Sequence, residues 1–200
     1  MKLSTLFYNL THIAYTHGEN GLDYATRRSN DTLYIYFQDS DGAVDWKNNL
    51  DFPIKCYGNL FAHRGFLRVW ESAKDCLSEQ ILDTGLKKIV VSGYSHGAAL
   101  AVLCHEFIWY HRPDLRDTIE GYGFGCPRVI WGIKNAYHEE RWAHFNVIKN
   151  IDDIITHLPP AFLGYFHVGN MIKIGKRGNY STVDAHRPES YMKELFKAEM

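Results

Sequence analysis

The segment spanning residues 88–110 constrains the fold of this chain more than any other. A β-branched run, KIVVS, leads into the pentapeptide GYSHG and then into an alanine-rich stretch. The run is typical of a strand buried on both faces, and residues 98–110 have the composition of a helix that Pro113 ends. The sequence therefore predicts a strand, a sharp turn centred on Ser95, and a helix.

The predicted turn gives Ser95 the surroundings of a nucleophile. Residues two positions before and after such a turn must be small to avoid collision, and Gly93 and Gly97 meet that requirement. The helix that follows directs its free N–H groups and positive dipole end toward the site where a tetrahedral intermediate carries its oxyanion. We expect Ser95 to be the nucleophile and the N–H of His96 to be one oxyanion donor. Ser92 lies inside the strand and lacks flanking glycines.

A serine hydroxyl becomes reactive only when a base takes its proton and an acid orients that base. On a strand–turn–helix unit of this kind the chain order is serine, then aspartate or glutamate, then histidine. Asp152 and Asp153 lie just past the strand candidate at residues 144–150. Both are candidates for the acid.

Three histidines follow in the sequence and compete for the role of base. His157 is so close to Asp153 along the chain that it can hardly reach the turn while that carboxylate supports it. His167 directly precedes a strand candidate. His186 lies in a loop before a helix that Pro188 begins, so it is free to lean toward Ser95. We expect His186 to be the base.

Predicted strands and helices alternate along the chain. An amphipathic helix within residues 1–18 precedes a hairpin of two strands at residues 22–27 and 32–38. A helix follows at residues 65–86, and further strand candidates lie at residues 118–127, 144–150 and 171–175. Such alternation predicts an α/β fold with a mainly parallel sheet and helices on both faces. With 200 residues, 46% of them hydrophobic, we expect one domain over residues 1–200. Residues 39–59 are polar and turn-rich, and their spaced apolar residues indicate an amphipathic flap.

Composition argues against several classes of function. The net charge is −1 and the basic residues are scattered, so no nucleic-acid partner is expected. The four cysteines form no C-x-x-C motif, and the HEERWAH segment has Trp142 where a zinc helix requires histidine. We therefore expect no metal and no cofactor. No apolar run is long enough to span a bilayer and no export signal is evident, so we expect a cytoplasmic protein.

Several segments together resemble the class 3 lipases, the fungal-lipase-like branch of the α/β hydrolases. They are LYIYFQDSDGAVDW, AHRGFL, IVVSGYSHGAALA followed by YGFGCPRV, and NIDDIITHLPP. The resemblance implies an α/β-hydrolase fold with Ser95 as nucleophile, Asp153 as acid and His186 as base. It also implies a second oxyanion donor at Ser40 and a lid over residues 41–52.

By this resemblance the chain is a serine carboxylic-ester hydrolase, a lipase or esterase that acts on an acyl ester or lipid and makes transient contact with a lipid interface. The alternative is a catalytically inactive hydrolase fold used for binding or as a scaffold. A scaffold has no reason to keep a strained turn around a serine, which favours the enzyme.

Overall fold

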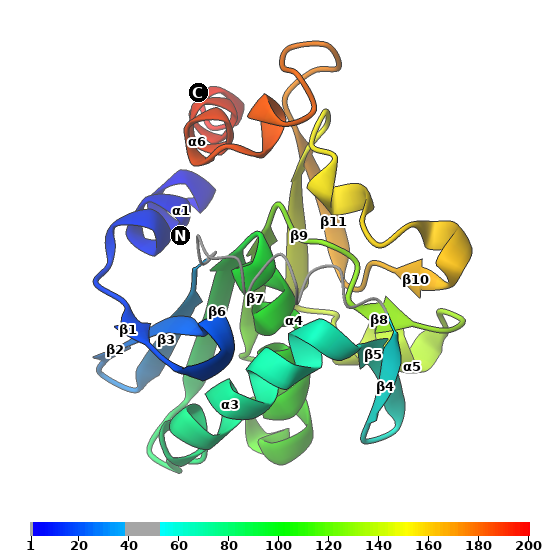
Figure 1. Cartoon of the computed structure of the whole chain (residues 1–200). Helices are drawn as coiled ribbons and strands as arrows, with labels where there is room; N and C mark the ends of the chain where they lie inside the picture. The colour runs from blue at the N-terminus through cyan, green and yellow to red at the C-terminus, as the bar shows by residue number, and fades with distance from the viewer. Residues whose placement is uncertain (1, 39–52) are drawn as a thin grey trace.

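The structure is a computed structural model that describes residues 2–38 and 53–200. A seven-stranded sheet has the order β1-β2-β3-β6-β7-β9-β11, with β3, β6, β7, β9 and β11 parallel and β1 and β2 antiparallel at one edge (Figure 1). The strands are β1 (Thr16–His17), β2 (Asp23–Ser29), β3 (Thr32–Phe37), β6 (Lys88–Tyr94), β7 (Glu120–Phe124), β9 (Phe145–Asn150) and β11 (Asn170–Ile174). The predicted hairpin and the four predicted parallel strands β6, β7, β9 and β11 are all present.

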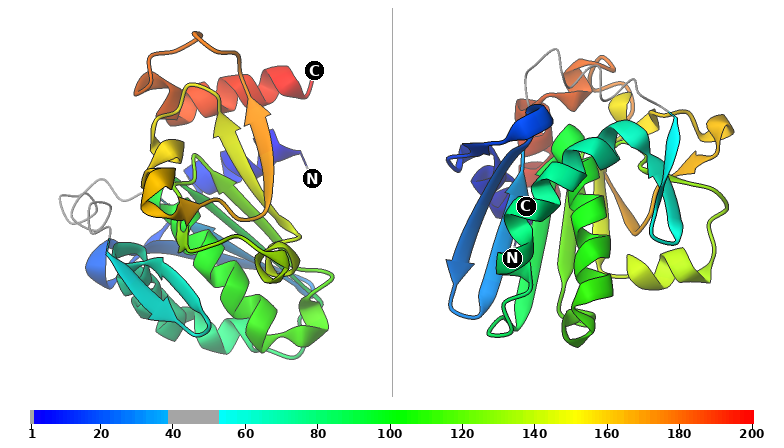
Figure 2. Two further views of the ribbon diagram at one scale, coloured as in Figure 1. Left: turned by 90° about the vertical axis from the view of Figure 1, so that its right-hand side faces the viewer. Right: turned by 60° about the horizontal axis from the view of Figure 1, so that its bottom comes forward.

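Helices cover both faces of this sheet (Figure 2). Helices α3 (Arg64–Ile81) and α4 (His96–His111) pack on one face, and α1 (Leu3–His12) and α6 (Pro188–Ala198) pack on the other. Neighbouring residues of β9 separate accordingly: Val147 joins the core cluster with α3 and α4, and Ile148 joins the cluster with α1 and α6. A parallel sheet with both faces covered buries successive side chains in this way. The predicted α/β architecture is confirmed.

A second, antiparallel sheet was not predicted from the sequence. Its order is β10-β8-β5-β4, built from β4 (Ile54–Tyr57), β5 (Leu60–His63), β8 (Ile130–Trp131) and β10 (Tyr165–Phe166). Two of these strands have only two residues each, and β4 is almost wholly exposed. Residues 54–57 belong to this sheet rather than to a flap.

Helix boundaries differ from the predicted ones at two points. Helix α4 begins at His96, two residues before the predicted start, directly after Ser95. Helix α3 ends at Ile81 because a turn follows, in which the Asp83 carboxylate accepts a hydrogen bond from the N–H of Gly85. A short helix, α5 (Ala136–Arg141), follows β8. Across the described residues, none of the helices combines the length and hydropathy that crossing a membrane requires.

Candidate active site

Ser95 lies at the predicted sharp turn between β6 and α4. Its backbone has φ 54° and ψ −121°, a conformation that residues other than glycine rarely adopt. A Cβ on Gly93 would lie 2.1 Å from the carbonyl oxygen of Gly97, and a Cβ on Gly97 would lie 2.2 Å from that of Phe37. Only glycine fits at these two positions, as the sequence pattern requires.

The structure brings Ser95, His186 and Asp153 into one hydrogen-bonded chain. Nε2 of His186 lies 2.7 Å from Oγ of Ser95, and Nδ1 of His186 lies 2.8 Å from Oδ2 of Asp153. A neutral imidazole that carries its proton on Nδ1 donates to the carboxylate and accepts from the serine hydroxyl. The arrangement suits Nε2 to remove the serine proton.

Asp153 is fully buried, and three donors satisfy its carboxylate. Besides His186, the hydroxyl of Tyr191 donates to Oδ2 at 2.6 Å and the N–H of Ile155 donates to Oδ1 at 2.9 Å. The Tyr191 oxygen in turn accepts the N–H of Asn150 at 3.1 Å. Burial, followed by the neighbouring charge of Asp153, raises the pKa of Tyr191 well above its ordinary value, so the phenol stays protonated and donates. Hydrogen bonds of this kind compensate for the burial of a charge.

The His186 ring is positioned by Tyr94 and by the backbone after β7. Tyr94 stacks on the imidazole with ring centroids 5.2 Å apart and 19° between the planes, and its hydroxyl donates to the carbonyl oxygen of His186. Gly125 follows β7 with φ 60°, and a Cβ there would lie 2.9 Å from Cε1 of His186. A glycine therefore leaves the space that the imidazole occupies.

The other acid and base candidates lie outside this hydrogen-bonded chain. The carboxylate of Asp152 accepts the N–H of Gly178 at 2.9 Å. Nε2 of His157 lies 2.7 Å from Nζ of Lys149. His167 donates from Nε2 to a backbone carbonyl, and burial lowers its pKa to about 4.

His96 is the first residue of α4, so its N–H lies at the helix N-terminus beside Ser95. Its side chain is buried, with the ring centroid 5.4 Å from that of Phe66. The ring therefore packs in the core rather than acting on Ser95. The expected oxyanion donor Ser40 and the expected lid over residues 41–52 lie outside the described residues.

Residues 34–163 match the family "Lipase (class 3)". The chain belongs to the class 3 lipase family. A lipase of Rhizomucor miehei is 30% identical over an alignment of 149 positions, which covers 70% of this chain and 41% of that protein. The chain thus spans less than half the length of this curated relative.

Solved structures of lipases share the fold of this class 3 lipase-family chain. A fungal lipase in complex with an inhibitor superposes with a TM-score of 0.71 at 26% identity, over 82% of this chain and 66% of that one. A triacylglycerol lipase, whose catalytic centre is described as a serine protease triad, superposes with a TM-score of 0.67 at 25% identity over the same shares. The α/β-hydrolase fold expected from the sequence is confirmed.

Two residues that support this site, Tyr191 and Gly125, were not predicted from the sequence. Tyr191 is a buried aromatic residue on an amphipathic helix, which is the pattern of ordinary core packing. Gly125 lies within the family segment YGFGCPRV, whose sequence pattern indicates no particular role for it. Neither pattern signals contact with the catalytic candidates, because both contacts join segments far apart in the sequence.

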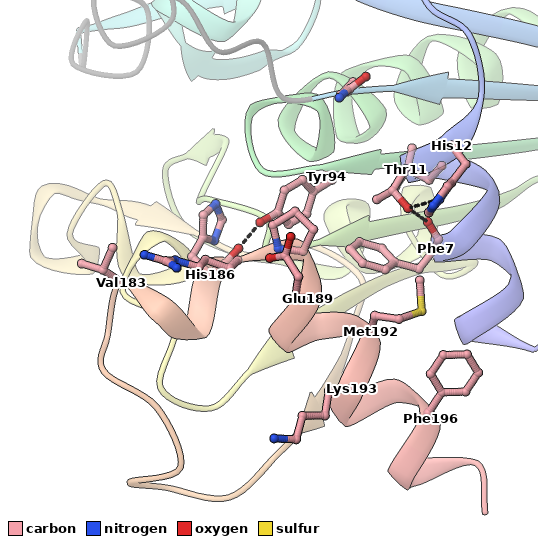
Figure 3. Close-up of a pocket in the computed structure, with 14 residues that line it drawn as sticks. Phe7, Thr11, His12, Tyr94, Val183, His186, Glu189, Met192, Lys193 and Phe196 are labelled. Carbon is pink, nitrogen blue, oxygen red and sulfur yellow. Dashed lines mark hydrogen bonds between the residues drawn. The ribbon is translucent and has the colours of Figure 1, made fainter.

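A cavity of about 900 Å³ opens beside His186, between α1 and α6 (Figure 3). Its wall combines apolar and polar residues in equal number. The apolar or aromatic ones are Phe7, Leu10, Tyr94, Val183, Pro188, Met192 and Phe196, and the polar ones are Thr11, His12, Gln38, His186, Arg187, Glu189 and Lys193. The volume and the mixed wall suit an organic molecule with a long apolar part. Within residues 2–38 and 53–200, no three potential metal ligands cluster closely enough to hold an ion.

Proposed function

We propose that this chain is a serine carboxylic-ester hydrolase that cleaves acyl esters through an acyl-enzyme. The observation that carries the proposal is the hydrogen-bonded chain from Ser95 through His186 to Asp153, with Ser95 held at a strained turn. The triacylglycerol lipase described as having a serine protease triad supports the same chemistry for this chain.

In the proposed reaction, Oγ of Ser95 attacks the ester carbonyl carbon while Nε2 of His186 takes the hydroxyl proton. His186 then gives that proton to the leaving alcohol, which leaves the acyl group on Ser95. A water molecule, deprotonated by the same imidazole, then attacks the acyl carbon, and His186 returns the proton to Oγ of Ser95 as the acid leaves. Asp153 holds the Nδ1–H of His186 and stabilises the imidazolium that forms in both halves of the reaction.

We propose that the backbone N–H of His96, at the N-terminus of α4, stabilises the oxyanion of each tetrahedral intermediate. Ser40 is proposed as the second donor on the strength of the family resemblance. Loss of one such donor lowers turnover by about a hundredfold or more in comparable enzymes.

The proposed substrate is an acyl ester or a lipid whose apolar part lies in the cavity beside His186. The apolar wall formed by Phe7, Leu10, Met192 and Phe196 supports this assignment. A relative whose structure was described in terms of interfacial activation supports transient contact with a lipid interface. Residues 41–52 are proposed as the lid.

Labelling with a fluorophosphonate tests the nucleophile directly. We expect stoichiometric modification of Ser95 in the native chain, no modification of Ser95→Ala, and loss of p-nitrophenyl ester hydrolysis in the same variant. An unlabelled native chain that folds normally would instead support the catalytically inactive scaffold. A chain-length series of p-nitrophenyl esters, with and without a lipid interface, then defines the acyl preference.

A further inference from the structure

Large apolar side chains are exposed in two adjoining segments, one of which reaches the candidate active site. Phe162 is 87% exposed and Val183 is 66% exposed, and Ile154 and Leu163 are each more than one third exposed. Val183 lines the cavity together with His186. The N–H of Ile154 donates to the carbonyl of Thr182 at 3.4 Å, so the loop carrying Val183 adjoins the segment that leads to Phe162. We call Ile154, Phe162, Leu163 and Val183 the apolar rim.

Positively charged side chains lie against the same segment. Nζ of Lys149 contacts His157, and Lys173 pairs with Lys149 in the register between β11 and β9. Arg128 donates to the carbonyl oxygens of His157 and Pro159, the latter at 2.9 Å. We call Arg128, Lys149 and Lys173 the cation group. The left-hand view of Figure 2 has β11 and the segment carrying the apolar rim on the same side of the molecule.

The cation group has no carboxylate partner in the part of the chain that the structure describes. The ion pairs found there involve other lysines and arginines, although the net charge of the chain is −1. The nearby Asp152 bonds to backbone N–H groups, and Asp153 is buried in the hydrogen bonds described above. Arg128 and Lys149 bond to uncharged groups, so no ion pair within the described residues neutralises the positive charge at this place.

Repulsion between positive charges contributes to lowered pKa values in this region. Desolvation lowers the pKa of Lys149, and the charges of Arg128 and Lys173 lower it further, against the opposing effect of Asp153. Desolvation also lowers the pKa of His157, together with Lys149 and Arg128. An anion placed among these groups relieves their mutual repulsion.

We propose that the apolar rim and the cation group form one docking surface for an anionic lipid layer. The exposed Phe162 and Leu163 enter the boundary of the acyl chains, while the cation group pairs with the anionic headgroups. The large exposed apolar side chains favour a lipid layer over a soluble anion, which gains nothing from them. Val183 belongs both to the apolar rim and to the wall of the cavity beside His186, so the surface adjoins the proposed lipid site and this inference rests on the proposed function.

Vesicle binding of the full chain tests the surface. Ser95→Ala serves as the parent because it leaves the vesicle lipids intact, and the probes are phosphatidylcholine vesicles with and without phosphatidylglycerol. We expect stronger partitioning onto the vesicles that contain phosphatidylglycerol. Lys149→Gln and Lys173→Gln should each weaken that partitioning about fivefold, from the usual contribution of one basic residue near an anionic surface. Phe162→Ser should weaken binding to both kinds of vesicle.

Matched controls lie at the opposite end of the strands. Lys87 precedes β6 and its side chain is 82% exposed, and Leu82 is 44% exposed after α3. Lys87 differs from the cation group in lying 3.7 Å from the Asp31 carboxylate, but Lys87→Gln and Leu82→Ser likewise remove one positive charge and one exposed apolar side chain. Both should leave partitioning unaltered. Equal binding to both vesicle compositions, or equal losses in the control variants, overturns the proposal. Displacement by millimolar inorganic phosphate beyond the effect of chloride at the same ionic strength also overturns it, because the site then belongs to a soluble anion.

Turnover of a soluble ester separates this proposal from the proposed function. With Ser95 intact, Lys173→Gln should keep the hydrolysis of p-nitrophenyl butyrate and lower the hydrolysis of lipid in vesicles that contain phosphatidylglycerol, by about fivefold when the lipid is limiting. Absence of all ester hydrolysis alongside the expected vesicle binding would remove the proposed function and leave the docking surface. Normal turnover of the soluble ester together with equal binding to both vesicle compositions would remove the docking surface and leave the proposed function.

Discussion

Replacing Ser95 with glycine should give a more stable protein than replacing it with alanine. Ser95 has φ 54° and ψ −121°, where a side chain costs about 1–3 kcal/mol of backbone strain. Glycine relieves that strain, and its greater freedom in the unfolded chain costs about 0.5–1 kcal/mol. Both variants lose the hydrogen bond from the hydroxyl to His186, so this loss cancels in the comparison. We expect the glycine variant to be more stable by about 1 kcal/mol.

Equilibrium unfolding in urea measures the difference as a free energy of unfolding. The same difference corresponds to about 2–4 °C in the midpoint of thermal unfolding for a chain of this length. Ala99→Gly is the matched control, because Ala99 is buried in α4 and the same exchange there should destabilise by about 2 kcal/mol, from helix propensity and the lost burial of a methyl group. An alanine variant at position 95 as stable as the glycine variant, or more stable, would refute the reasoning from backbone strain.

Three further predictions concern the surroundings of the site. Tyr191→Phe leaves the buried N–H of Asn150 without its partner and removes one donor from the triad carboxylate; we expect unfolding in urea to show a loss of about 1–3 kcal/mol, and kcat on a soluble ester to fall with KM unchanged. Burial lowers the pKa of His105 to about 3 and of His167 to about 4. Their contribution to the free energy of unfolding is therefore complete above pH 6.5, about the pKa of an unfolded histidine, and falls by roughly 3 kcal/mol for each as the pH drops toward 4. Urea unfolding across that pH range measures the fall, and an equally steep pH dependence in His105→Gln would contradict this. Gly97→Ala forces a Cβ to within 2.2 Å of a carbonyl oxygen of β3, and we expect it to destabilise the chain by about 3 kcal/mol, with native-like unfolding as the contrary result.

Much of the large sheet was predictable because its signals are local. The run before Ser95 reads as a strand buried on both faces, and the alanines after it read as a helix, whatever lies elsewhere in the chain. The same holds for the hairpin of β2 and β3, whose turn contains Asn30 with φ 54°. The choice of His186 among three histidines followed from its position in a loop, and the structure brings that residue to Ser95.

The small sheet and the support of the site were not predictable in this way. β8 and β10 have two residues each, so neither shows an alternating pattern, and their pairing is fixed by segments distant in the sequence. Tyr191 has the pattern of a core residue, because whether its hydroxyl reaches water or Asp153 depends on how α6 packs against β9. A contact between residues 38 positions apart leaves no periodic trace in either segment.

The strand order explains why the proposed triad needs a glycine that takes no part in its chemistry. Ser95 follows β6, Asp153 follows β9, and β7 lies between those two strands in the sheet. Because parallel strands end at the same edge, an imidazole that links the hydroxyl to the carboxylate must pass across the end of β7. Gly125 stands there with φ 60°, and a Cβ on it would lie 2.9 Å from His186 Cε1. The absent side chain after the intervening strand is therefore as much a requirement of the hydrogen-bonded chain as the three residues that form it.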